Sequence, residues 1–315
     1  MKPLVSIALC TYNGAKYLSQ QLDTLVDQTY SNIEIIVVDD CSNDATFNIL
    51  TGYALKYPQF KIYKNETNLG FAGNFERAVT LCNSDLIALC DQDDLWHPQK
   101  IELQVDAIKD NVFVYHDSEF INEDGSTMNK KMSDIMNLYR GGEPEVFLFF
   151  NCVSGHSILM RKRLLDEALP LKKGYFHDWW LAYVATNIGK IDFIPQCLVQ
   201  YRQHDKSETN ILQLSRKKDK YNFSKSENFD KTLHWLSYCA GFRGNKNKVL
   251  IEQIYEAYGR RLDRFVSFGL SALLLKHWKT MFFIRKKTTI SKLNYIRKQS
   301  LGLRVKRLFG EKIFH

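Results

Sequence analysis

The sequence predicts an α/β protein whose mostly parallel, Rossmann-like sheet is flanked by helices and followed by a basic helical extension. Two observations predict this fold. Short apolar runs alternate with segments of helical periodicity through the first hundred residues, and polar clusters follow three of the runs. This alternation is typical of open parallel sheets, which bind ligands at the carboxyl ends of their strands.

Four short apolar runs predict the strands of this sheet. The first is followed by Thr11, the second by Asp39 and Asp40, and the fourth by Asp91. The runs are residues 4–9, 33–38, 60–63 and 86–90.

Helices are predicted between and after these strands. Leu18, Leu22 and Leu25 recur at helical spacing after the first strand. Pro98 suits the first turn of the helix that follows the fourth strand. Further predicted helices are residues 45–57, 72–82 and 177–188, and two less regular strands are residues 157–160 and 197–201.

The composition is that of a globular protein. The chain has 315 residues, of which 45% are hydrophobic and 25% charged, and its seven Cys are scattered without a CxxC pair. These values exclude disordered and disulfide-stapled classes and favour a reducing compartment. Residues 1–20 lack a secretory pattern, and the longest apolar stretch, residues 265–275, is about half a membrane span. We therefore expect a cytoplasmic protein that does not span a membrane.

The charge is divided unequally along the chain. Residues 1–204 carry 18 Lys and Arg against 26 Asp and Glu, whereas residues 205–315 carry 25 against 9. Such asymmetry suggests two tasks. We predict a catalytic domain at 1–204 and a basic helical region at 205–315.

The motifs exclude some chemistries and favour another. The sequence contains no GxxxxGK[ST], GxGxxG, GxSxG or HExxH motif, which disfavours P-loop, classical dinucleotide, serine hydrolase and zinc protease chemistry. What remains is a carboxylate cluster at strand ends, which repels itself unless a divalent cation neutralises it. Asp91 and Asp93 offer hard oxygen ligands that suit Mg²⁺ or Mn²⁺, and such ions bridge phosphate oxygens.

Four stretches carry a resemblance to a known family. Residues 5–13 (VSIALCTYN), 34–46 (EIIVVDDCSNDAT), 89–96 (LCDQDDLW) and 175–181 (YFHDWWL) resemble, in order and spacing, the family 2 glycosyltransferases of the GT-A fold. The resemblance covers about residues 3–204. The motifs DQDDLW, HDWW and YRQH are similar to those of the bacterial rhamnosyltransferase-like branch, which builds surface polysaccharides.

The resemblance implies a donor site for a nucleotide-diphosphate sugar. Asp39 matches the residue that hydrogen-bonds the base, and a carboxylate is a good acceptor for the imide N–H of uracil or thymine. The alternative is that Asp39 and Asp40 cap the next helix. The implied donor-binding residues are Thr11, Tyr12, Asn13, Asp39, Asp40, Asn68, Gly70, Asp91 and Gln92.

The resemblance also implies a metal site and a catalytic base. Asp93 and Asp91 match the DxD motif that binds Mn²⁺ or Mg²⁺, and His204 resembles a late His near the diphosphate or metal; a surface His is its alternative. Asp178 matches the general base of an inverting transfer, although His177 replaces the more usual Glu before it.

Four residues are implied near the acceptor. Gly155 and His156 lie in a stretch that resembles the loop beneath the acceptor, and Gly155 suits a close backbone approach. Trp179 and Trp180 offer flat faces for sugar stacking, and one of them is expected in the core.

The basic tail predicts a surface partner. Residues 285–315 carry ten Lys and Arg against one Glu, interleaved with apolar residues. This pattern suits amphipathic helices on an anionic membrane surface. Nucleic acid is the rival partner, disfavoured by the acidic catalytic half, and a helical cap on the core is the plainer alternative.

These observations predict an inverting, metal-dependent glycosyltransferase at the inner face of the cell membrane. Its donor is expected to be UDP- or dTDP-linked, and its acceptor a lipid-linked saccharide of a bacterial surface polysaccharide. Two other classes remain open: a catalytically idle nucleotide- or carbohydrate-binding subunit, and a nucleotidyltransferase. The latter usually has a Gly-rich, basic triphosphate loop, which residues 11–16 match poorly.

Overall fold

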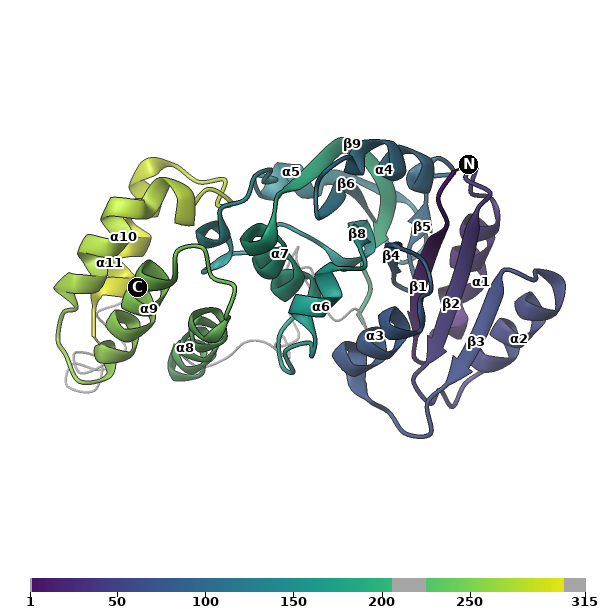
Figure 1. The fold of residues 1–315 in the computed structure, drawn as a ribbon, viewed down its shortest axis with the longest axis horizontal. Coiled ribbons are helices and arrows are strands. Elements are labelled where there is room, and N and C mark those ends of the chain that lie inside the picture. The colour runs from purple at the N-terminus through teal and green to yellow at the C-terminus, as the bar shows by residue number, and fades with distance from the viewer. Residues whose placement is uncertain (1, 206–224, 303–315) are drawn as a thin grey trace. The chain divides into compact units, whose positions relative to one another are not determined.

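The computed structural model describes residues 2–205 and 225–302 (Figure 1). Their central element is a nine-stranded sheet with the order β3-β2-β1-β4-β8-β6-β9-β5, to which β7 is added by pairing with β6. The first four strands pair in parallel, and the antiparallel partners follow beyond β4. The predicted α/β class with a mostly parallel, helix-flanked sheet is confirmed.

The amino-terminal elements alternate as the sequence predicts. Every apolar run predicted as a strand is one, and every predicted helix follows its strand. The elements are β1 (Val5–Thr11), α1 (Ala15–Val26), β2 (Ile33–Asp39), α2 (Thr46–Lys56), β3 (Phe60–Lys64), α3 (Gly70–Leu81) and β4 (Leu86–Cys90).

The middle of the chain adds the strands that follow residues 91–94, which we call the acidic loop. The predicted helix 177–188 is found with the same bounds, whereas the strand predicted at 157–160 begins only after a 3₁₀ turn. The elements are β5 (Leu95–Trp96), α4 (Lys100–Ile108), β6 (Phe113–Ile121), β7 (Thr127–Lys131), α5 (Met132–Ile135), η1 (Pro144–Phe147), η2 (Gly155–Ser157), β8 (Leu159–Arg161), α6 (Leu164–Ala168), α7 (His177–Ile188) and β9 (Ile191–Arg202).

Both faces of the parallel strands are buried, which explains their continuous apolar runs. Alternate residues such as Ile7 and Val37 join α1 and α2 residues in one core cluster. The intervening residues, such as Ala8 and Ile36, are equally buried, and α3 packs on β1 and β2. The apolar side chains therefore leave only the strand ends available for polar chemistry.

Strand register places the polar residues at one edge. Thr11 pairs with Asp39 at the carboxyl ends of β1 and β2, and Leu9 pairs with Cys90 one residue before Asp91. The short strand β5 pairs antiparallel with β9, with Leu95 opposite Gln200. This pairing returns the segment after β9 to the acidic loop.

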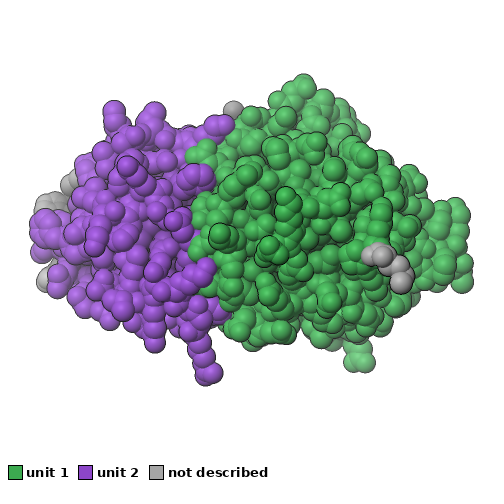
Figure 2. Space-filling view, turned by 45° about the horizontal axis from the view of Figure 1, so that its top comes forward, with its two compact units in different colours: residues 1–142, 152–214 green, residues 143–151, 215–315 purple. Residues whose placement is uncertain are grey.

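The chain forms two compact units, coloured separately in Figure 2. Unit 1 is Met1–Gly142 with Cys152–Leu214, and unit 2 is Glu143–Asn151 with Ser215–His315. The predicted domain division at residues 204 and 205 stays a prediction, and it does not anticipate the place of Glu143–Asn151. The helices of unit 2 are α8 (Lys225–Gly241), α9 (Lys248–Gly259), η3 (Arg260–Leu262), α10 (Phe268–Met281) and α11 (Thr289–Ser300).

Unit 2 has its own aromatic core around the inserted segment. The Phe149 ring lies 6.1 Å from that of Phe282, and the Phe150 ring lies 5.4 Å from that of Tyr295. Trp235 donates its indole N–H to the Phe147 carbonyl. The described part of the chain contains no helix that is long and apolar enough to cross a membrane. The basic tail predicted from Arg285 continues into residues 303–315, which lie outside the described residues.

Candidate active site

The first part of the site is the junction of the β1 and β2 ends. Asp39 is fully buried, and its carboxylate accepts hydrogen bonds from Thr11 Oγ1 (3.0 Å), Ser42 Oγ (2.5 Å) and Ser42 N–H (3.0 Å). Asn13 adopts a positive φ of 47° and donates its N–H to Ser42 Oγ. Asp39 thus fixes the loops that follow both strands.

Asp40 organises a different loop. Its carboxylate accepts the backbone N–H groups of Leu69 (2.8 Å) and Gly70 (2.9 Å) at the start of α3. Gly70 has a φ of 74°, and Asn68 Oδ1 accepts the same Gly70 N–H. The structure therefore brings Asp40, Asn68 and Gly70 together, and Asp40 caps α3 rather than the next helix, α2.

Gln92 joins the β1 loop to the acidic loop. Tyr12 N–H donates to Gln92 Oε1 (2.9 Å), and Gln92 Nε2 donates to the Tyr12 carbonyl (3.0 Å). A Cβ at Gly14 would collide with the Gln92 amide, so glycine is needed there for the close approach. The Tyr12 side chain remains 47% exposed, which leaves its ring available to a ligand.

The carboxyl end of β9 holds the acidic loop from the other side. His204 Nε2 lies 2.9 Å from Asp93 Oδ2. Arg202 donates its Nε–H to the Asp93 carbonyl (2.9 Å) and its backbone N–H to Asp94 Oδ1 (2.9 Å). The predicted neighbourhood of Asp93 and His204 is thus present, and Arg202 is a further site residue that motif matching missed.

A buried polar layer lies behind the acidic loop. His156, only 1% exposed, has Nδ1 at 3.5 Å from Asp94 Oδ2 and at 3.9 Å from Asp91 Oδ2, and its Nε2 lies 2.9 Å from Ser118 Oγ. Burial, with a smaller contribution from Lys100, lowers the pKa of His156 to about 3, so the imidazole is neutral at pH 7. His156 therefore lies buried beside the carboxylates, and its expected contact with the acceptor stays a prediction.

The same layer contains the buried amino group of Lys100. Lys100 Nζ donates to Gln104 Oε1 (3.0 Å) and lies 3.4 Å from the centre of the Trp96 ring. Burial lowers the pKa of Lys100 to about 7, against the attraction of Cys90 and Asp94. Nothing in the sequence except a lone Lys after the acidic motif signalled this group.

The carboxylates of the loop disfavour one another's ionisation. Burial raises the pKa of Asp91, and the neighbouring charges of Asp93 and Asp178 raise it further. Burial and the charges of Asp93 and Asp91 likewise raise the pKa of Asp94. Asp94 Oδ2 is a buried acceptor without a hydrogen-bond partner. An arrangement of this kind is suited to a cation.

Among the described residues, the ligand atoms of Asp91, Asp94 and His156 lie within 4.8 Å of one another and could hold a hard divalent ion. Of the predicted set of Asp91, Asp93 and His204, the structure brings Asp93 and His204 into contact, and the set as a whole stays a prediction. Carboxylate oxygens with one imidazole nitrogen suit Mg²⁺ or Mn²⁺. The donor chemistry therefore fits the expected metal.

Asp178 lies in the first turn of α7 and is held by the predicted acceptor loop. Gly155 N–H donates to Asp178 Oδ2 (3.1 Å). The His177 ring stacks on Phe75 at 4.2 Å, and its Nε2 would lie 2.7 Å from a Cβ on Gly155. Glycine at 155 thus permits the contact that positions the Asp178 carboxylate.

The two tryptophans after Asp178 differ in environment. Trp180 is 2% exposed, donates its indole N–H to the Ala168 carbonyl (2.7 Å) and stacks on Tyr183. Trp179 is half-buried. Trp180 is therefore the core member of the pair, as expected for one of them, and only Trp179 presents surface to a ligand.

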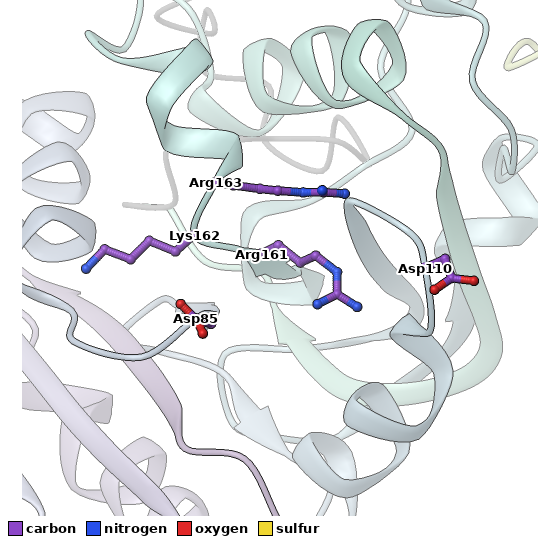
Figure 3. Close-up of a pocket in the computed structure, with 5 residues that line it drawn as sticks. All are labelled: Asp85, Asp110, Arg161, Lys162 and Arg163. Carbon is purple, nitrogen blue, oxygen red and sulfur yellow. The ribbon is translucent and has the colours of Figure 1, made fainter.

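A separate charged cavity of about 480 Å³ lies at the opposite end of β4 (Figure 3). Its lining includes Asp85, which precedes β4, Arg161, which ends β8 and pairs with Leu86, and Lys162, which follows it. Arg161 and Lys162 point in opposite directions and donate to the backbone carbonyls of Asn111 and Cys82. The cavity contains none of the predicted site residues.

The chain belongs to glycosyltransferase family 2, because residues 6–169, more than half of its length, match the family described as "Glycosyl transferase family 2". An uncharacterized glycosyltransferase of Haemophilus influenzae is 26% identical over 320 residues, covering 94% of this chain and 97% of the relative. Another, from Rickettsia typhi, is 33% identical over 221 residues, which are 66% of each chain.

The fold has solved counterparts. S. aureus TarS 1-349, crystallised in complex with UDP-GlcNAc, is similar with a TM-score of 0.59 at 16% identity, over 97% of this chain and 83% of that one. This likeness confirms the expected GT-A fold. The family match identifies the chain as a glycosyltransferase.

Proposed function

We propose that the chain is an inverting, metal-dependent glycosyltransferase that transfers a sugar from a UDP- or dTDP-linked donor to a lipid-linked saccharide acceptor. The observation that carries the proposal is the closeness of the acidic loop to Asp178. The charge of Asp178 is close enough to raise the pKa of Asp91, after burial and Asp93. The consecutive residues Gly155 and His156 connect the two groups, since the Gly155 N–H donates to Asp178 Oδ2 and His156 Nδ1 lies 3.9 Å from Asp91 Oδ2. We infer that a donor bound on the acidic loop lies near this base.

On the donor side, the β1 and β2 loops form the nucleoside site. Tyr12 offers an exposed ring beside the Gln92 bridge. Asp39 is the proposed acceptor of the base imide N–H, and because its carboxylate is fully buried, this contact requires the loop of Ser42 to move. The UDP and UDP-GlcNAc complexes of TarS support a nucleotide-sugar donor of this kind.

On the acceptor side, Asp178 is the general base. Its carboxylate accepts the proton of the acceptor hydroxyl as that oxygen attacks the anomeric carbon from the face opposite the nucleotide. The Gly155 N–H orients the carboxylate. Trp179 provides the apolar face against which the acceptor sugar stacks.

The residues that would hold Mn²⁺ or Mg²⁺ are Asp91 and Asp93 with His204. When bound, the ion supplies positive charge that stabilises the departing nucleoside diphosphate. Arg202 keeps the Asp93 backbone in place for this task.

We place the reaction at the inner face of a bacterial cell membrane, in the synthesis of a surface polysaccharide. The basic balance of residues 205–315 supports an anionic membrane as partner. The acidic balance of residues 1–204 disfavours nucleic acid there.

The test is a screen of nucleotide sugars with the full chain and Mn²⁺ or Mg²⁺, read as release of the nucleoside diphosphate. We expect turnover with a UDP- or dTDP-linked donor, lost in EDTA and in Asp93→Ala. Turnover that persists in both conditions overturns the metal role. Nucleotide binding without any turnover favours the idle binding subunit.

A further inference from the structure

The carboxy-terminal helices carry a surface that the transfer reaction does not use. Residues 264–302 contain nine Lys and Arg and no Asp or Glu. Of the ten large apolar side chains exposed in the described parts of the chain, six lie between residues 265 and 293. Positive charge and exposed apolar area are thus concentrated in the same segment.

Helix α10 presents both properties on one face. Phe268 is 76% exposed and Leu275, seven residues later, is 49% exposed. Lys276 and Lys279 are exposed beside them. These four residues, which we call the α10 stripe, lie on one side of the helix because spacings of 7, 8 and 11 residues return to the same face.

The opposite face of α10 already forms the core of unit 2. Leu270, Leu274 and Met281 are fully buried, and the helix packs on α9, α11 and η1. The α10 stripe therefore does not belong to the helix–helix packing. Clustered exposed apolar side chains usually mark an interaction surface.

The chemistry of the α10 stripe fits a partner that has anionic groups at its surface and an apolar layer beneath them. A bilayer interface accepts Phe and Leu at the headgroup–acyl boundary, while Lys side chains reach anionic headgroups. No carboxylate between residues 264 and 302 opposes this approach. A second exposed apolar pair, Ile290 (72%) and Leu293 (41%), opens α11 within the same acid-free segment.

We propose that the α10 stripe docks unit 2 on an anionic bilayer as an interfacial helix. The docking rests on the proposed function only for its purpose, access to a lipid-linked acceptor, and needs no turnover. The proposed partner of the α10 stripe is anionic lipid. Binding to a protein or a nucleic acid instead would be a different outcome of the test.

The first experiment is co-sedimentation of the full chain with vesicles of phosphatidylcholine, with and without phosphatidylglycerol. In the variant Phe268→Ser/Leu275→Ser we expect the partition coefficient on anionic vesicles to fall about tenfold or more, because two apolar groups that the bilayer would bury are lost. The matched control, Leu55→Ser/Val249→Ser, removes apolar side chains that are 86% and 67% exposed elsewhere, and should change partitioning less than about twofold.

The second experiment tests the charge. Lys276→Gln/Lys279→Gln should lower partitioning on anionic vesicles about 30-fold at low salt, and should leave the weak binding to neutral vesicles unchanged. Because the Debye length falls to about 3 Å at 1 M salt, this difference should disappear there.

The outcomes of these experiments either support or overturn the proposed docking. Equal sedimentation of the wild type and the Phe268→Ser/Leu275→Ser variant, or no sedimentation of the wild type, overturns the proposal. The proposal is also overturned if the same variants keep their binding to vesicles but lose binding to single-stranded RNA. Donor hydrolysis in solution is measured on each preparation, since an inactive protein that sediments contradicts only the proposed function, and an active one that does not sediment contradicts only the docking.

Discussion

Asp39 and Asp40 show how adjacent carboxylates acquire different tasks from their partners. Asp39 is held by Thr11 and Ser42 at the strand ends, whereas Asp40 accepts the N–H groups at the start of α3. The motif alone assigns both residues to donor binding. Asp40 also holds the loop before α3, because its carboxylate accepts hydrogen bonds from Asn65, Leu69 and Gly70, and its contact with the donor stays a prediction.

Glu34 provides a test of electrostatics away from the site. Burial alone would raise its pKa, but hydrogen bonds from Lys61, Ser6 and Asn83 outweigh burial and lower the pKa to about 2. A folded-state pKa below the unfolded value of 4.5 means that the stabilisation is present above pH 4.5 and is lost as the pH falls toward 2.

We therefore expect Glu34→Gln to lower the free energy of unfolding by about 1–3 kcal/mol at pH 7. Urea unfolding at pH 7 and pH 3 measures the difference between variant and wild type, which should shrink at pH 3. A difference that is the same at both pH values would contradict the assignment.

Gly155→Ala tests the contact behind the base. The new Cβ would lie 2.7 Å from His177 Nε2, so the loop or the ring must shift and the Gly155 N–H moves relative to Asp178. We expect kcat to fall about 10-fold or more with little change in the donor KM, since positioning errors act on turnover.

The control for this prediction is the double variant Gly155→Ala/His177→Ala. Removing the imidazole gives the methyl group room, so the two substitutions should be strongly non-additive in kcat. Purely additive losses would mean that the His177 contact does not position Asp178.

At the scale of elements, the sequence predicts the parallel half of the sheet well and the rest less well. Strands such as β1 and β2 are buried on both faces, so their apolar runs are unambiguous. Strand β6, FVYHDSEFI, places His116, Asp117 and Ser118 in its buried middle, where they bond to neighbours. Such polar residues conceal a strand, because tertiary partners satisfy them and no local pattern shows this.

The site was predictable to the same extent. Motif matching named Asp93 and His204, which the structure brings to 2.9 Å of each other. It did not name Arg202, because its importance depends on the pairing of β5 with β9, which is a contact between residues about a hundred positions apart. The burial of His156 was hidden for the same reason.

Arg202→Met tests this junction of β9 with the acidic loop. Arg202 is 2% exposed, and its guanidinium donates to the Asp93 and Glu123 carbonyls and to Gln20 Oε1. Leaving these acceptors unpaired should cost about 2–4 kcal/mol in the free energy of unfolding and raise the Mn²⁺ concentration needed for turnover.

The matched control is Arg140→Met, whose side chain is 60% exposed in its ion pair with Asp192. Exposed pairs contribute little, so its unfolding free energy should change by less than about 1 kcal/mol. Similar losses in both variants, measured by urea unfolding, would count against the role of Arg202.

At the scale of the molecule, the two units have separate cores, and the segment 143–151 belongs with the distant helices. The sequence shows only an apolar cluster at 147–150. Its destination is set by ring contacts such as Phe149 with Phe282 and Phe150 with Tyr295, which no local periodicity encodes.

Phe282→Ala tests the core of unit 2. The ring is fully buried and contacts Phe149, Phe150 and Tyr295. We expect a loss of about 3–5 kcal/mol in the free energy of unfolding of this unit. Phe268→Ala, at a position that is 76% exposed, should change it by about 0.5 kcal/mol or less. Equal effects, measured by calorimetric unfolding, would contradict the separate core.

Asp178 is the proposed base of a sugar transfer from a donor bound on the acidic loop. Asp178→Asn keeps the shape of the side chain and removes its basic oxygen. The decisive measurement pairs calorimetric donor binding with transfer kinetics in this variant, using Asp166→Asn on the exposed side of α6 as the control. We predict donor binding within about twofold of wild type and transfer reduced by about 10²–10⁴-fold. Transfer by Asp178→Asn at nearly the wild-type rate would contradict this prediction.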